Sequence, residues 1–183
     1  MRKKITLGIC ASSAIWKACP LIERLQNELD AEVNVVMTQA SMEFIQPLMF
    51  QTISKNPVFT KMTDETKDNK IAHIHLAQSC DLLLIVPITA NTIGKIAYGF
   101  ADDLLTAIAV ATPKKTPKLL APAMNDQMYQ QEVVQGNLAT LKKRGYIEIP
   151  PREDILSSGK KAIGVLAELD EIIVAAKTAL SEK

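Results

Sequence analysis

The chain has 183 residues, a length that suits one domain able to bury a hydrophobic core without disulfides or metals. Twenty-one Lys and Arg against twenty Asp and Glu give a net charge of +1, so the electrostatic attraction that nucleic acid or an anionic membrane surface requires is missing. No apolar run approaches the roughly 20 residues that span a bilayer. We therefore expect neither a nucleic-acid partner nor a membrane partner.

The three cysteines, Cys10, Cys19 and Cys80, lie in apolar segments without C-x-x-C spacing. Such cysteines are typical of free, buried thiols in a reducing compartment, so a cytoplasmic location is expected and a zinc site is not.

The chain begins with a βα pattern. A strand is predicted at Ile5 to Cys10, and apolar positions from Ala14 to Leu29 recur with the 3.6-residue period of a helix. Pro20 falls inside that pattern, where it removes a backbone donor. The sequence therefore predicts either a kinked helix or a helix that starts near Lys17.

Strands and helices continue to alternate along the rest of the chain. The predicted strands are Val33 to Met37, a short one near Val58, Leu82 to Val86, Lys118 to Ala121, and Tyr146 to Ile149. The predicted helices are Ser41 to Phe50, Lys70 to Ser79, Thr92 to Tyr98, Leu104 to Ala111, one that follows Asn125 and ends at Gly145, and Leu169 to Leu180. The stretch Pro150 to Gly164 is predicted to be irregular. This alternation predicts a single α/β domain over residues 1–183, built on a doubly wound, Rossmann-like parallel sheet.

Two of the apolar strands end in loops of small and polar residues, Pro87 to Thr92 and Pro122 to Met128. Open α/β sheets bind ligands at the carboxyl ends of their strands, where loop amides and hydroxyls supply donors. The two loops are therefore candidates for a binding site.

Each candidate side chain also has a purely structural interpretation. Ser12 and Ser13 can simply cap a helix, and Asn125 is typical of a turn after a strand. Met128 can fill the core, and His73 on a helix face is more often packed or solvated than catalytic. The residues alone leave these alternatives open.

A longer pattern of residues favours the functional interpretation of these side chains. His73-Ile74-His75-Leu76, Cys80-Asp81, Pro87 to Thr92 with Lys95, Ala101-Asp102, and Pro122 to Asn125 with Met128 follow one another in this order. The string resembles the flavin-dependent cysteine decarboxylases over most of residues 4–150. Members of that family act on the cysteine of phosphopantothenoylcysteine in coenzyme A biosynthesis, or on the terminal cysteine of lantibiotic precursor peptides. Some of them continue into a ligase domain, which this chain is too short to include, so a monofunctional enzyme is expected.

The resemblance implies an FMN cofactor and a small-molecule cysteine conjugate as substrate. Direct loss of the carboxylate would leave a carbanion without an electron sink, which oxidation of the thiol-bearing carbon provides. His73 would be the acid/base group at the thiol, and Asn125 would bind the substrate carboxylate through its amide. The expected FMN contacts are Ala11, Ser12, Ser13, Thr38, Thr89, Ala90, Asn91, Thr92 and Ala123. Asn125, Met128 and Ser158 would contact the substrate.

The sequence departs from the family pattern at three positions. Ala11 stands where relatives usually have Gly, which costs roughly 1 kcal/mol if the backbone there needs a positive φ. Thr89 stands where Ser is common. Where relatives carry the clamp segment A-C-G-D-x-G-x-G-R, this chain has Leu156 to Gly164, with Ser158 at the position of the cysteine that supplies a proton. A hydroxyl is far less acidic than a thiol, so the reductive half of the reaction is in question.

Three functions follow from this comparison. The first is an FMN-dependent decarboxylase that makes 4′-phosphopantetheine from 4′-phospho-N-pantothenoylcysteine. The second is an oxidative decarboxylase of a peptidyl or other cysteine conjugate that stops at the enethiol, and the third is a flavin-binding regulatory subunit without catalysis. Relatives place the flavin between the subunits of a trimer, so a homotrimer, or a dodecamer of stacked trimers, is expected.

Overall fold

A computed structural model describes residues 2–66, 68–156 and 159–181 of the chain. Its central feature is a sheet of six parallel strands in the order β3-β2-β1-β4-β5-β6. The strands are β1 (Lys3–Ile9), β2 (Ala31–Met37), β3 (Val58–Phe59), β4 (Leu82–Ile88), β5 (Lys118–Pro122) and β6 (Tyr146–Glu148). The predicted doubly wound parallel sheet is confirmed.

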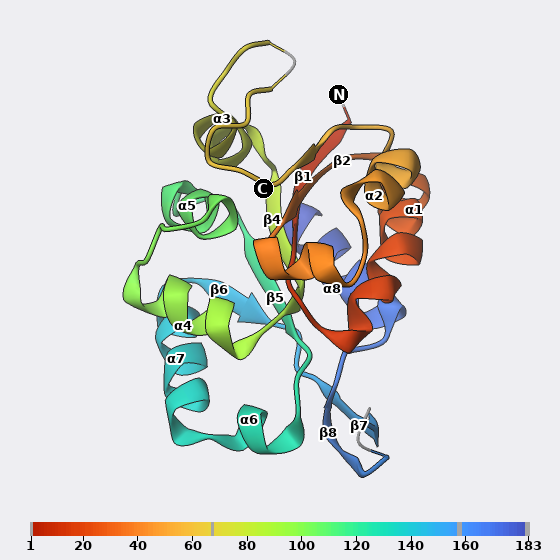
Figure 1. Ribbon diagram of the computed structural model, residues 1–183, viewed down its shortest axis with the longest axis vertical. Coiled ribbons are helices and arrows are strands. Elements are labelled where there is room, and N and C mark those ends of the chain that lie inside the picture. Colours follow the sequence, from red (N-terminus) through yellow and green to blue (C-terminus); the bar gives the residue numbers. More distant parts are fainter. Residues whose placement is uncertain (1, 67, 157–158, 182–183) are drawn as a thin grey trace.

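Helices cover both faces of this sheet (Figure 1). One face packs against α1 (Ala18–Leu29), α2 (Pro47–Ser54) and α8 (Leu169–Ser181). The other packs against α3 (Ala72–Ser79), α4 (Ala90–Tyr98), α5 (Leu104–Ala111) and α7 (Glu132–Lys143). In β4 the side chains alternate between the two layers, because Leu82 and Leu84 belong to the first core and Leu83 and Ile85 to the second. A strand buried on both faces reads as an unbroken apolar run for this reason.

The start of α1 settles the alternative that Pro20 left open. A 3₁₀ turn, η1 (Ser13–Lys17), comes first, and α1 begins at Ala18. Pro20 therefore lies in the first turn of α1, where its missing N–H would have no intrahelical partner in any case. The helix starts close to Lys17, and no kink is required.

Two predicted helices are wrong in extent. The predicted helix Ser41 to Phe50 is replaced by a 3₁₀ turn, η2 (Gln39–Glu43), and by α2, which begins at Pro47. Proline favours the first helical position and pushes the preceding residue, here Gln46 with φ −70° and ψ 143°, into an extended conformation. The single helix predicted after Asn125 is in fact α6 (Asp126–Gln130) and α7, separated by the extended Gln131.

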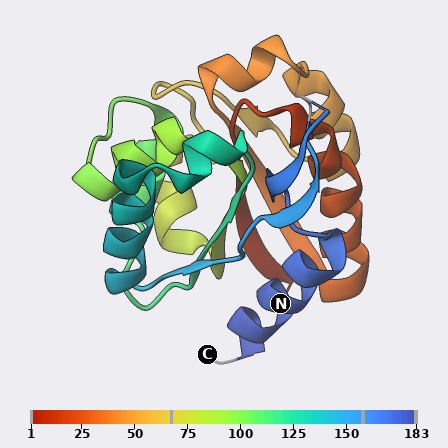
Figure 2. The same cartoon turned by 90° about the horizontal axis from the view of Figure 1, so that it is seen from below.

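The stretch Pro150 to Gly164, predicted to be irregular, contains an antiparallel hairpin. Its strands are β7 (Arg152–Ile155) and β8 (Lys161–Val165), which pair with each other and not with the main sheet. Most of its side chains are charged or exposed, so the apolar pattern that reveals a buried strand is absent. The hairpin stands beside α6 at the lower end of the molecule in Figure 1, and Figure 2 views that end directly.

The strand order defines where a ligand can enter. From β1 the chain builds outward to β2 and β3, and from β4 it builds in the opposite direction to β5 and β6. The loops that leave β1 and β4 therefore diverge at the carboxyl edge of the sheet, which is the usual ligand-binding crevice of such folds.

Gly8 in β1 permits the close packing of α5 on the sheet. A Cβ atom at this position would lie 2.5 Å from Leu105 Cδ1 and 3.3 Å from Ile85 Cγ1.

We expect Gly8→Ala to lower the free energy of unfolding by about 1–3 kcal/mol through overpacking, measured by urea denaturation. Gly136→Ala is the matched control, because its Cβ would meet nothing within 4 Å on the exposed face of α7. It should raise stability by about 0.5–1 kcal/mol, and a similar loss in both variants would contradict the close approach at Gly8.

Candidate flavin and substrate site

A cavity of about 530 Å³ lies at the carboxyl edge of the sheet, at the β1/β4 divergence. Its walls come from segments far apart in the chain: the turn after β1, Thr89 at the end of β4, the turn after β5, and the β7–β8 hairpin. Seven of the predicted site residues line it, namely Ala11, Ser12, Ser13, Thr89, Ala123, Asn125 and Met128. The fold thus brings Thr89 of the first predicted loop to Ala123, Met124, Asn125 and Met128 of the second.

Ser12 joins two walls of this cavity. Its Oγ accepts a hydrogen bond from the Ala14 amide at 3.3 Å, which caps η1, and donates to the Ala123 carbonyl at 3.2 Å. The capping role is therefore real, and the same hydroxyl ties the turn after β1 to the turn after β5. Three non-glycine residues among those described have positive φ, and Ala11 is not one of them. The expected strain at Ala11 is absent.

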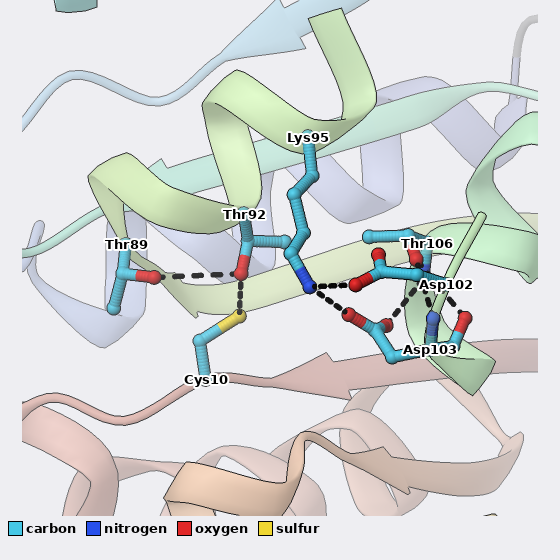
Figure 3. Close-up of polar contacts among 7 residues, drawn as sticks. All are labelled: Cys10, Thr89, Thr92, Lys95, Asp102, Asp103 and Thr106. Atoms are coloured by element: carbon cyan, nitrogen blue, oxygen red, sulfur yellow. Dashed lines mark hydrogen bonds and ion pairs between the residues drawn. The ribbon is translucent and has the colours of Figure 1, made fainter. Parts of the chain in front are cut away.

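The start of α4 rests on a buried hydroxyl and thiol cluster (Figure 3). The Cys10 thiol donates to Thr92 Oγ1 at 3.3 Å, and the Thr89 and Thr92 hydroxyls lie 3.4 Å apart. Burial raises the pKa of Cys10 to about 11, so the thiol stays protonated and unreactive at neutral pH. Thr89 borders the cavity, and Thr92 and Cys10 thus hold its hydroxyl in place from the side away from the cavity.

Lys95 connects α4 to the start of α5. Its ammonium lies 2.8 Å from Asp102 Oδ2 and 3.0 Å from Asp103 Oδ2, as Figure 3 shows. Asp103 is also the N-cap of α5, because its other carboxylate oxygen accepts from the Thr106 amide and Thr106 Oγ1 accepts from the Asp103 amide. The sequence predicted a cap at Asp102 or Asp103, and the structure assigns it to Asp103.

Asn125 is exposed and is the N-cap of α6. Its Oδ1 accepts from the amides of Gln127 at 2.9 Å and Met128 at 3.4 Å, and its Nδ2 donates to Asp126 Oδ1 at 3.1 Å. These contacts fix the amide in one orientation, with the oxygen toward the helix. An amide nitrogen carries two hydrogens, so the Asp126 contact leaves one N–H for an anion in the cavity.

Several predicted residues lie elsewhere in the structure. Thr38, Ala90, Asn91 and Thr92 do not line the cavity, although Thr92 supports it from beneath. Ser158 lies outside the described residues.

His73 is on α3, which Figure 1 shows toward the opposite end of the molecule from α6, and it is not part of the cavity lining. Its Nδ1 is buried and has no hydrogen-bond partner within the described part of the chain. A single chain therefore does not bring His73 and Asn125 into one cavity.

Sequence reasoning missed part of the lining. Trp16 and Phe44 border the cavity with more than half of each side chain exposed, and Arg152 and Asp154 of the hairpin line it as a pair. The available signal for the first two was an aromatic residue in the segment after each strand, three residues after Ser13 and six after Thr38. The hairpin residues carried none, because the hairpin itself was not predicted.

The cavity fits a flavin. Small side chains at Ala11, Ser12 and Ala123 let a planar ligand approach the backbone, and Trp16 and Phe44 add apolar surface. The hydroxyls of Ser13 and Thr89 supply neutral donors for the polar part of the ligand. Within residues 2–66, 68–156 and 159–181, no group of three His, Cys, Asp or Glu side chains gathers to hold a metal, and no helix is long and apolar enough to cross a membrane.

The chain belongs to the flavoprotein family, whose model matches residues 1–180. It is 46% identical over 173 residues to the probable phosphopantothenoylcysteine decarboxylase of Streptococcus mutans serotype c, which covers 94% of this chain and 96% of that relative. The chain is 40% identical over 181 residues to the bifunctional coenzyme A biosynthesis protein of Haemophilus influenzae, of which it spans 44%.

Solved structures agree with this assignment. A crystal structure of the FMN-dependent cysteine decarboxylase SpaF is similar with a TM-score of 0.86 and 29% identity, covering 98% of this chain and 96% of that one. A PPC decarboxylase variant complexed with pantothenoylaminoethenethiol is similar with a TM-score of 0.85 and 30% identity over the whole of both chains. The predicted family of flavin-dependent cysteine decarboxylases is confirmed, and a flavin cofactor follows from it.

The two aspartates beside Lys95 offer a test of the cap at the start of α5. We expect Asp103→Ala to lower the free energy of unfolding by about 1–2 kcal/mol, because it removes the α5 cap. Asp102→Ala removes only an exposed ion pair with the same lysine, so its urea midpoint should stay close to that of the unmodified protein. Equal effects of the two substitutions would show that the cap does not stabilise this region.

Proposed function

We propose that the protein is an FMN-dependent decarboxylase that converts 4′-phospho-N-pantothenoylcysteine to 4′-phosphopantetheine in coenzyme A biosynthesis. The observation that carries this proposal is the cavity that unites the turn after β1, Thr89 and Asn125. It occurs in a chain 46% identical to a probable phosphopantothenoylcysteine decarboxylase over nearly its whole length.

When bound, FMN supplies an acceptor for the electrons of the thiol-bearing carbon, so that the carboxylate can leave as carbon dioxide. Ser12, Ser13 and Thr89 would hold the cofactor from the edge of the sheet. Asn125 would direct its remaining amide N–H at the substrate carboxylate, and its fixed oxygen keeps the amide from turning. Met128, half exposed at the start of α6, would contact the body of the substrate.

His73 would exchange the proton of the substrate thiol, since an imidazole ring can both accept and donate a proton. Because His73 does not line the cavity of its own chain, a second copy must supply it. This supports a homotrimer in which His73 of the partner subunit completes the site. Exposed Trp16 and Phe44 on the cavity wall provide apolar surface for such contacts. So do exposed Leu48 of α2 and exposed Tyr98 and Phe100 at the end of α4.

Ser158 in place of the clamp cysteine favours a second candidate, an oxidative decarboxylase that releases the enethiol. The mass of the product separates the two, because the enethiol is two hydrogens lighter than the saturated thiol.

Mass spectrometry of the products tests the proposed function. We expect purified, FMN-loaded protein given 4′-phospho-N-pantothenoylcysteine to release carbon dioxide and 4′-phosphopantetheine. The lighter product alone would favour the second candidate. A yellow protein with neither product, and with no bleaching by cysteine conjugates, would leave only a regulatory flavin-binding role.

A shared site predicts complementation between two inactive variants. His73→Asn removes the acid/base group, and Asn125→Asp keeps a good N-cap but places a carboxylate against the substrate carboxylate. Each variant alone should lose turnover while keeping bound flavin. Random mixed trimers should recover about a quarter of the activity per site, because one site in four combines an intact His73 from one chain with an intact Asn125 from another. Co-expression with two affinity tags provides the mixed sample, and an inactive mixture would contradict a site shared between subunits.

A further inference from the structure

An ion pair joins the segment between β7 and β8 to the turn that carries Asn125. Lys160, one residue before β8, places its Nζ 2.6 Å from Asp126 Oδ2. Asp126 is the first residue of α6, and its side chain is only 4% exposed, whereas that of Lys160 is 59% exposed. The same carboxylate accepts from Asn125 Nδ2 through Oδ1 and from Gln127 Nε2 through Oδ2. Lys160 and Asn125 are therefore linked through one buried carboxylate.

The backbone of β8 touches the same turn. The Met124 amide donates to the Gly164 carbonyl at 3.0 Å. A Cβ atom on Gly164, whose φ is +153°, would lie 2.2 Å from the Met124 carbonyl oxygen, so only glycine permits this approach. β8 and the residue before it thus rest on the Asn125 turn at two points: Gly164 through its backbone and Lys160 through its side chain.

The charge of Asp126 bears directly on substrate binding. The hydrogen bond from Lys160 is the main reason that the pKa of Asp126 is below its ordinary value, so the carboxylate is ionised at neutral pH. It lies beside the amide to which the proposed function assigns a substrate carboxylate. Two carboxylates that share a site repel each other, and Lys160 offsets the charge of the first. Two cations, Arg152 and Lys17, line the cavity itself. Each lies close to another carboxylate: Arg152 to Asp154 and Glu168, and Lys17 to Glu168.

We propose that Lys160 is a positioning residue for anionic substrates. Its ion pair with Asp126 offsets the negative charge of that carboxylate beside Asn125, and it holds β8 against the Asn125 turn. The proposal rests on the proposed function for the identity of the anion, a substrate carboxylate. It assigns Lys160 no contact with the substrate itself. Asp126 connects Lys160 to the side-chain amide of Asn125.

Steady-state kinetics with 4′-phospho-N-pantothenoylcysteine test the electrostatic part. Lys160→Met leaves Asp126 without its cation, so KM should rise about tenfold with kcat within about twofold of the unmodified enzyme. Lys161→Met is the matched control, since the neighbouring Lys161 is exposed and forms no ion pair within the described residues. Lys160→Arg keeps the charge and should keep the KM.

The double variant Lys160→Met/Asp126→Asn shows whether the unpaired Asp126 charge causes the higher KM of Lys160→Met. With the carboxylate gone there is nothing to neutralise, so KM should return to within about threefold of the unmodified enzyme. A KM that stays raised would mean that Lys160 touches the substrate directly, and would overturn the proposal. Equal KM values for Lys160→Met and Lys161→Met would overturn it as well.

Hydrogen exchange without substrate tests the seating of β8 independently of the reaction. In Lys160→Met the amide of Met124, which donates to Gly164, should exchange several-fold faster than in Lys161→Met. Unchanged exchange would refute the seating role even if the enzyme is active. If no cysteine conjugate is decarboxylated but exchange rises as expected, the proposed function fails and the structural link between Lys160 and the Asn125 turn stands.

Discussion

The divergence of the chain between β1 and β4 is the constraint on which the site depends. These two neighbouring strands lie at the centre of the sheet, and their following segments leave in opposite directions. The crevice between those segments opens at the carboxyl edge because every strand of the main sheet is parallel. The cavity, the turn that holds Ser12 and the turn that holds Asn125 all follow from this one topological feature.

Short polar contacts then set the shape of the crevice. Ser12 ties two turns together, Thr92 supports Thr89 through a buried cluster, and Asn125 fixes its own amide by capping α6. A hydrogen bond of this kind contributes only about 1 kcal/mol net, so none of them holds the fold together. Their effect is directional, because each restricts a donor or a backbone turn to one orientation in front of the ligand. In this account the buried sheet provides stability, and the loop contacts provide geometry.

The sequence predicted the sheet well, because buried strands such as Leu82 to Val86 and capped helices such as Leu104 to Ala111 carry strong local signals. It also predicted the two loops that meet in the cavity, since their positions at strand ends imply proximity. It did not predict the β7–β8 hairpin, whose charged strands have no apolar period. It also did not predict the break at Gln131, because no Pro or Gly marks that position. The bridge from Lys160 to Asp126 joins residues 34 apart in the chain, and such a pairing leaves no trace in local pattern. The separation of His73 from Asn125 was also beyond local pattern, because it depends on where the fold places α3.

The arrangement gives each carboxylate near the cavity a defined partner. Asp126 pairs with Lys160, and Asp154 and Glu168 pair with Arg152, so a cation offsets each of these carboxylates near a site for an anionic substrate. In the proposed function an uncharged amide, that of Asn125, then provides the specific donor. This combination suits a site that must bind a carboxylate and later release a neutral gas.

The most direct test of the account is a titration with FMN, followed by flavin fluorescence, of the unmodified protein and of Ser13→Trp. Ser13 is exposed and lines the cavity, so a tryptophan there should fill the flavin space without disturbing the core. The account predicts saturable binding of one FMN per chain to the unmodified protein, and at least a hundredfold weaker binding to a Ser13→Trp variant that unfolds at the same urea concentration. Equal affinity of the two proteins, or no FMN binding by either, would contradict a flavin site at the β1/β4 divergence.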